Sequence, residues 1–164
     1  MMRMRGYSLV ELLVAIAVIG LGALGAAGLQ LANAKNTRIA LERTTAVMLA
    51  QDMAERLRAN PSGDYLGVAE GTGPGGFVNC LAVNCAPNEL ERFDVAVWKC
   101  SLGRWAEEGA CRSARAAGAL PSRARQPGLP MGDGTVEWGT DGEFTVAVSW
   151  QSAGVQHASV GGRR

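Results

Sequence analysis

The chain has 164 residues, 48% of them hydrophobic and 19% charged, which suits a single ordinary folded domain. Its formal net charge is only +1, so it lacks the basic excess of a nucleic-acid-binding protein, and we expect no nucleic-acid partner. Four cysteines form an even set.

The first predicted element is a membrane-spanning helix. Residues 12–29 carry no formal charge and follow Leu9 and Val10. At about 1.5 Å per residue, a helix of this length crosses the hydrocarbon core of a bilayer. Arg3 and Arg5 precede it and no acid does, which keeps the N-terminus in the cytoplasm. The rest of the chain is expected outside the cytoplasm.

Glu11 stands at the start of this apolar segment. A carboxylate costs about 2.5 to 3.5 kcal/mol at the centre of a membrane helix, less near the interface, and it usually has a partner. The other interpretation is a glutamate solvated among the lipid headgroups without a role. The residues around Glu11 decide between the two.

The segment Gly6-Tyr7-Ser8-Leu9-Val10-Glu11 and the apolar run behind it resemble the class III signal of type IV pilins and pseudopilins. The resemblance implies that a prepilin peptidase cleaves between Gly6 and Tyr7, that Tyr7 is N-methylated, and that assembly requires Glu11. Residues 1–6 are then a leader, and its removal changes the net charge to −1 (14 basic against 15 acidic residues). The family usually has Phe at the position of Tyr7, but the ring is kept, so we expect processing.

The chemistry agrees with this interpretation. Cleavage creates an amino group on Tyr7, which can neutralise a carboxylate in a medium of low dielectric. Glu11 points away from its own N-terminus in a straight helix, so the amine of a neighbouring subunit is the expected partner. Small residues let helix backbones approach closely in a membrane, and the segment contains Gly20, Gly22, Gly25 and Gly28.

A secretory signal peptide is the rival interpretation of the N-terminus. Ala32-Asn33-Ala34 fits a cleavage site of the A-x-A kind, which would start the mature protein at Lys35. The hydrophobic part of a signal peptide is about 7 to 15 residues and seldom contains a carboxylate. The longer apolar run and Glu11 therefore favour the pilin signal.

From Gln30 to Asn60 the pattern becomes amphipathic. Apolar residues recur at three- and four-residue steps or their sums: Ile39, Ala46, Ala50, Met53 and Leu57. We predict one helix from Leu9 to Asn60, because a residue before a proline disfavours the α conformation and Pro61 follows. The segment from Gln51 to Pro61 resembles the corresponding part of the PilV family of minor pilins, the type IV pilus modification proteins.

A loop follows, and the four cysteines come after it. Residues 61–79 are predicted as a flexible connection, and their Gly-rich centre lacks the Gly-Lys-Ser/Thr ending of a phosphate-binding loop. In an exported chain the cysteines favour disulfides, and four cysteines allow three connectivities. We favour the local pairs, Cys80 with Cys85 and Cys100 with Cys111. A zinc site is the alternative, but the spacing fits poorly, so we expect no metal.

Period-two patterns predict three or four antiparallel strands after the loop. The candidates are 93–98, 135–138, 144–150 and, more weakly, 155–160. Residues 101–130 read as a decorated loop with a short helix through Arg104 to Ala117. An antiparallel sheet has one apolar face to cover, and the amphipathic half of the long helix is available for it. We therefore expect an α+β fold, which the pilin resemblance also implies.

Catalysis has little support in the sequence. The only histidine, His157, lies in the weak edge-strand candidate, and neither Ser149 nor Ser159 is part of a motif around it. A catalytic triad needs a base oriented by a third group. We expect no enzyme, no catalytic residue and no cofactor, and an exposed His157.

The expected organisation has four parts: a leader over 1–6, a transmembrane or filament-core helix over 7–31, an amphipathic periplasmic helix over 32–60, and a periplasmic head over 61–164. The resemblance implies a single-pass inner-membrane protein that joins the pilus. Its implied partners are the prepilin peptidase, other minor pilins, the major pilin and a pilus-tip adhesin. The alternatives are a minor pseudopilin of type II secretion and a membrane-anchored or secreted binding domain.

Overall fold

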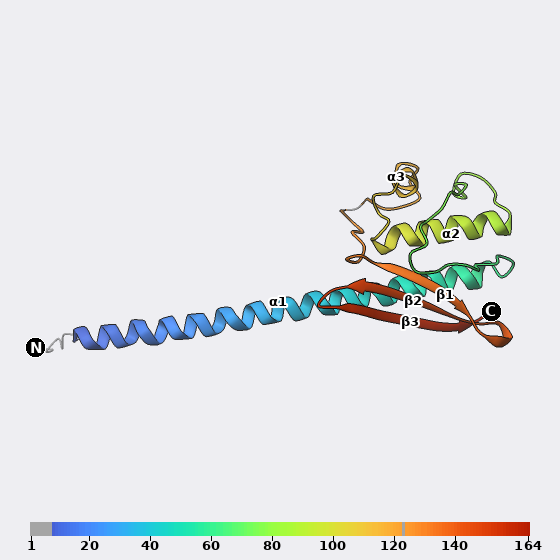
Figure 1. Ribbon diagram of the computed structural model, residues 1–164. Helices are drawn as coiled ribbons and strands as arrows, with labels where there is room; N and C mark the ends of the chain where they lie inside the picture. Colours follow the sequence, from blue (N-terminus) through green and yellow to red (C-terminus); the bar gives the residue numbers. More distant parts are fainter. Residues whose placement is uncertain (1–7, 123) are drawn as a thin grey trace, which may run out of the picture. The chain divides into compact units, whose positions relative to one another are not determined.

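The computed structural model describes residues 8–122 and 124–164 (Figure 1). Its elements are α1 (Leu9–Ala59), α2 (Pro87–Leu102), α3 (Gly109–Ala116), β1 (Asp133–Trp138), a 3-10 turn η1 (Thr140–Gly142), β2 (Glu143–Gln151) and β3 (Val155–Arg163). The chain divides into two compact units. The first ends at Ala40, and the second runs from Leu41 to Arg164.

The first unit is the apolar part of α1. Among the described residues, α1 is the one helix that is long and apolar enough to cross a membrane, with a mean hydropathy of 2.4 in its most apolar window. The large apolar side chains between Leu9 and Leu31 are all exposed. A helix that is apolar all round needs lipid or other helices around it. This agrees with the predicted membrane segment.

The second unit places the rest of α1 against a sheet. From Leu41 onward α1 buries one face, formed by Ala46, Leu49, Ala50, Met53, Ala54 and Leu57. The amphipathic prediction is therefore confirmed from Ala46 onward, whereas Ile39 belongs to the first unit and is 37% exposed. The helix ends at Ala59, one residue before the predicted end, and the Asn60 amide still donates to the Arg56 carbonyl at 3.0 Å.

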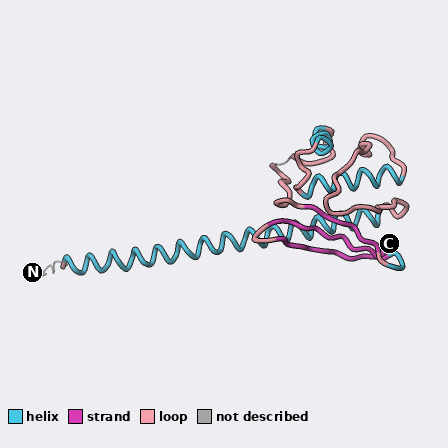
Figure 2. Tube along the Cα trace, in the orientation of Figure 1, coloured by secondary structure: helices cyan, strands magenta, loops and turns pink. Residues whose placement is uncertain are grey.

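The sheet has three antiparallel strands in the order β1-β2-β3 (Figure 2). In its register Val136 faces Val146, and Val146 faces Val160. The predicted apolar face of β2 is confirmed, because Phe144, Val146, Val148 and Trp150 are buried. These residues and the buried face of α1 belong to one hydrophobic cluster. The head is thus held to α1 by apolar burial, the dominant favourable term in folding.

The prediction of a strand at 93–98 is wrong, because these residues lie within α2. Pro87 occupies the first turn, and the Glu89 carboxylate accepts a hydrogen bond from the Ala86 amide at 2.9 Å. Both are start signals of a helix. The helix is buried on two sides: Phe93 and Val97 face one hydrophobic cluster and Trp98 the other. The sequence of a short helix that is buried on two sides has a pattern of apolar residues like that of a buried strand.

The segment after α2 is more ordered than the predicted decorated loop. α3 lies within the predicted short helix at 104–117, although it is shorter. The structure contains the two favoured disulfides, Cys80–Cys85 and Cys100–Cys111. All four thiols are thus paired in disulfides. Cys100 and Cys111 also belong to the second hydrophobic cluster, which joins α2 to α3.

Candidate functional site

The first candidate site is the N-terminal turn of α1. Glu11 lies in this turn and is exposed, and the Ser8 hydroxyl accepts a hydrogen bond from the Val10 amide at 3.4 Å. Within residues 8–122 and 124–164, no cation forms an ion pair with Glu11. Gly6 and Tyr7, the predicted cleavage and methylation residues, lie outside the described residues. Glu11 is thus a carboxylate on an apolar helix surface.

The same helix carries four exposed glycines. A methyl group placed on any of Gly20, Gly22, Gly25 or Gly28 would meet no atom within 4 Å. Nothing in the described chain therefore requires glycine there for packing, although each glycine weakens a helix by about 1 kcal/mol relative to alanine. Close approach of another helix would account for such residues.

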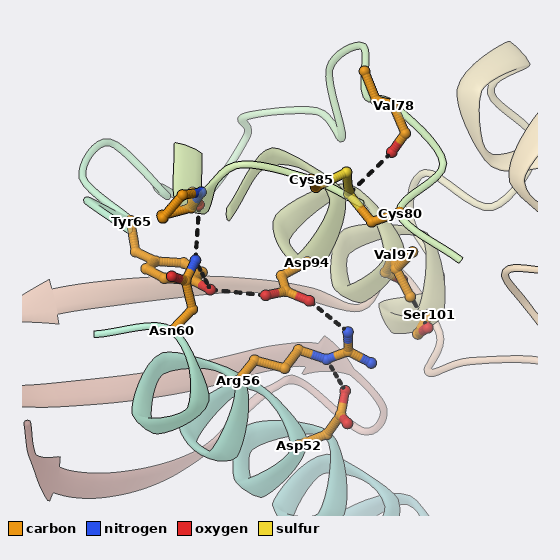
Figure 3. A network of polar contacts seen from close by, with 11 residues as sticks. Asp52, Arg56, Asn60, Tyr65, Val78, Cys80, Cys85, Asp94, Val97 and Ser101 are labelled. Atoms are coloured by element: carbon orange, nitrogen blue, oxygen red, sulfur yellow. Dashed lines mark hydrogen bonds and ion pairs between the residues drawn. A yellow bond between two sulfur atoms is a disulfide. The ribbon is translucent and has the colours of Figure 1, made fainter. Parts of the chain in front are cut away.

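The second candidate site is the junction between α1 and the head (Figure 3). Arg56 bridges two carboxylates: its Nε donates to Asp52 at 3.0 Å and its Nη1 to Asp94, on α2, at 2.8 Å. The other oxygen of Asp94 accepts a hydrogen bond from the Tyr65 hydroxyl at 2.8 Å. Burial, and then the bond to Asp94, raise the pKa of Tyr65, so its hydroxyl remains a donor.

The end of α1 is held by further polar contacts in the same junction. The Asn60 side chain donates to the Pro87 carbonyl at 2.8 Å and to the Tyr65 hydroxyl at 3.3 Å. Arg164 donates to the carbonyls of Asn60 and Gly63, and its guanidinium lies 4.8 Å from the centre of the Trp138 ring. A cation at the carboxyl end of a helix satisfies free carbonyls and complements the helix dipole.

A buried ion pair anchors the loop that precedes α2. Lys99 Nζ and Asp133 Oδ1 are 2.6 Å apart, and both side chains are fully buried. Lys99 also donates to the carbonyls of Ala69 and Gly134, and Asp133 accepts from the Gly71 amide at 2.8 Å. The predicted flexible connection is therefore fixed at residues 69–71. No local sequence signal predicts this pair, because its members are 34 residues apart.

The residues considered for catalysis do not form a nucleophile and base. His157 is exposed on β3, opposite Ser149 on β2. The Ser149 hydroxyl donates to Glu70 at 3.1 Å, and no hydrogen bond joins Ser149 to His157 among the described residues. In the same part of the chain, no three His, Cys, Asp or Glu side chains are grouped so that they could hold a metal ion.

A long apolar N-terminal helix that packs its second half on a small three-stranded antiparallel sheet defines a pilin-like fold. Two family models match the chain: the prokaryotic N-terminal methylation motif over residues 1–27 and type IV pilin Tt1218 over residues 28–96. No curated protein and no solved structure matches it. The fold and the two matches support a type IV pilin, a class of structural, non-enzymatic proteins in general.

Proposed function

We propose that this protein is a minor pilin of the PilV kind, which is incorporated into type IV pili and takes part in pilus assembly and initiation. The observation that carries the proposal is Glu11, a carboxylate in the first turn of an exposed apolar helix, within the match to the N-terminal methylation motif. An enzymatic role is not part of the proposal.

In the proposed life cycle the protein is first a single-pass inner-membrane protein with a cytoplasmic N-terminus. The prepilin peptidase cleaves between Gly6 and Tyr7, and Tyr7 is methylated. Residues 7–31 form the transmembrane and then the filament-core helix, residues 32–60 the amphipathic half, and residues 61–164 the periplasmic head. The apolar window of α1 and the preceding Arg3 and Arg5 support this topology.

Glu11 is proposed to pair with the N-terminal amine of a neighbouring subunit. A charge left without a partner in lipid is unfavourable, so the assembled state is favoured over the dispersed one. The neighbours in the proposal are other minor pilins, the major pilin and a pilus-tip adhesin. The exposed glycines of α1 support close packing of helices there.

The narrower assignment to the PilV kind rests on the segment from Gln51 to Pro61. In the structure this segment supplies Arg56 and Asn60, which bind Asp94, Tyr65 and the Pro87 carbonyl. The residues that carry the resemblance therefore hold the head on α1. This gives them a physical reason to occur together at this place in a pilin.

The test replaces Glu11 by alanine in a strain that makes pili. We expect the Glu11→Ala protein to reach the membrane in normal amounts but to be depleted in sheared pili, about tenfold or more if one charge pair of 1.4 kcal/mol is lost. Ser8→Ala, which changes a neighbouring polar residue without removing a charge, is the control. Equal incorporation of Glu11→Ala and wild type would contradict the role of Glu11.

A further inference from the structure

The two edge strands of the sheet differ in whether their outward backbone groups have partners. At the β1 edge, the Val136 amide donates to the Val68 carbonyl at 2.9 Å, and the Gly134 carbonyl accepts from Lys99 at 2.7 Å. Val68 in the loop before α2 and Lys99 on α2 therefore cover that edge. β3 forms the other edge, because the strand order is β1-β2-β3. Figure 1 shows β3 as the outermost strand of the three.

The hydrogen-bond pattern shows which groups of β3 face outward. Opposite residues of β2 and β3 bond directly at both ends of the ladder: the Ser152 amide donates to the Gly154 carbonyl, and the Arg164 amide to the Gly142 carbonyl, both at 2.9 Å. Bonded and non-bonded pairs alternate in an antiparallel ladder. The even-numbered residues of β3 therefore bond to β2, and the odd-numbered residues direct their amides and carbonyls outward.

In the part of the chain that the structure describes, nearly all of these outward groups have no partner. They belong to Val155, His157, Ser159, Gly161 and Arg163. Within residues 8–122 and 124–164, the exception is the Val155 carbonyl, which accepts from the Gln156 side chain at 3.3 Å. The edge thus offers a row of backbone donors and acceptors, the groups that bind another strand.

The edge also lacks the usual protection against strand pairing. Soluble proteins shorten an edge strand, twist it with a bulge, or place proline and lysine on it. β3 has nine residues paired in continuous register with β2, and it contains neither proline nor lysine. Its inward residues Ala158 and Val160 pack against the core but are only half-buried. Part of the apolar surface at Ala158 and Val160 therefore stays exposed beside the β3 edge.

We propose that β3 is a docking edge for an extended segment of another protein, which adds as a fourth antiparallel strand. The segment would carry apolar side chains at alternate positions, beside Ala158 and Val160. It would also carry a carboxylate near Arg163, the only formally charged residue of β3. The Arg163 guanidinium already donates to Glu143 at 2.9 Å, but its side chain is 65% exposed and its other N–H groups can bind a second carboxylate. This site is separate from Glu11 and does not depend on the proposed incorporation into pili.

A peptide with the sequence of β2, residues 143–151, is a suitable probe. It has the required chemistry, since β3 already accepts this sequence on its other side with Glu143 opposite Arg163. Binding of the fluorescein-labelled peptide to the full-length protein in detergent would be followed by anisotropy. The control peptide carries proline in place of Ala147, which removes a strand-pairing donor.

Ser159→Pro and Ser159→Ala form the matched pair of variants. Proline removes an outward amide of β3 and leaves the bonds to β2 in place, whereas alanine keeps that amide. We expect saturable binding to wild type and Ser159→Ala, and binding about tenfold weaker or more to Ser159→Pro. Absence of binding to wild type, or equal binding to the two variants, would overturn the proposal.

Two further measurements cover the cases in which Ser159→Pro does not fold or a second copy of the protein occupies the edge. If Ser159→Pro does not fold, amide exchange of the wild-type protein decides: the peptide should protect the amides of His157, Ser159 and Gly161, and unchanged exchange would overturn the proposal. Ser159→Cys and Val155→Cys examine a second copy as the occupant. In a symmetric antiparallel pair centred on Ser159, only the former would cross-link. Such selective cross-linking would also overturn the proposal.

Discussion

Arg56 and Asp94 form an ion pair of 2.8 Å that joins α1 to α2. The Asp94 side chain is 8% exposed and that of Arg56 is 27% exposed, so the pair is partly shielded from water. Asp94 also accepts the hydroxyl of Tyr65, a residue with a positive φ of 47°. The contact therefore fixes both the angle of α2 on α1 and a strained turn after the helix.

Replacing Asp94 by asparagine should destabilise the head. The change removes the charge that pairs with Arg56 and leaves a neutral acceptor for Tyr65. We expect the free energy of unfolding to fall by about 2 kcal/mol, as for a hydrogen bond to a charged group. Chemical denaturation in detergent would measure it. Glu55→Gln, at an exposed ion pair with Arg58, is the control and should change stability by less than about 0.5 kcal/mol.

The buried pair Lys99 and Asp133 should make stability sensitive to acid. Burial alone would raise the pKa of Asp133, but Lys99 and the amides of Gly71 and Gly134 hold that pKa below its usual value. A carboxyl with a lowered folded-state pKa stabilises the fold above its unfolded pKa, about 3.9, and this stability is lost as the pH falls. Unfolding at pH 6 and pH 3 should show the loss.

Lys99→Met tests whether this pair causes the acid sensitivity. Removing Lys99 leaves the buried Asp133 carboxylate with Arg104, 3.5 Å away and 37% exposed, as its remaining ion-pair partner. The loss of the closer, buried partner should cost about 3 kcal/mol near neutral pH. Without Lys99, less opposes the effect of burial, so the pKa of Asp133 rises relative to the wild type and acid costs the fold less. The variant should therefore lose less stability between pH 6 and pH 3 than the wild type does. An unchanged pH dependence would show that other carboxyls govern it.

The two disulfides should contribute unequally. Cys80–Cys85 spans 5 positions in the chain and Cys100–Cys111 spans 11, so loop entropy alone gives about 2 and about 3 kcal/mol. Cys100 and Cys111 are also buried, whereas Cys80 and Cys85 are partly exposed. Replacing both members of each pair by alanine and comparing the denaturation midpoints checks the order. A larger loss without Cys80–Cys85 would contradict it.

Regular patterns were the predictable part of this fold. The long helix, its end near Pro61, the alternation in β2 and the local disulfides all follow from residues that are close in the sequence. Residues 93–98 belong to α2 but were predicted as a strand, because burial on both sides hides the helical period over a short run. The start of α2 at Pro87 and Glu89 was a usable signal.

The polar contacts were not predictable in the same way. Arg56 and Asp94 are 38 residues apart, and neither belongs to a recognisable motif for pairing. The open edge at β3 likewise depends on which strand ends the sheet and on Val68 closing the other side. These contacts depend on the tertiary fold. Glu11, by contrast, can be identified as a candidate site residue from a local motif alone.

The N-terminus of the protein recovered from sheared pili tests the central claim most directly. Mass spectrometry of the N-terminal peptide should show a chain that begins at Tyr7 and carries a methyl group on its amine. A start at Lys35 would indicate a secreted domain, and an uncut Met1 in the membrane, with no protein in pili, a plain anchor. Either result would contradict the account of this protein as a processed pilin.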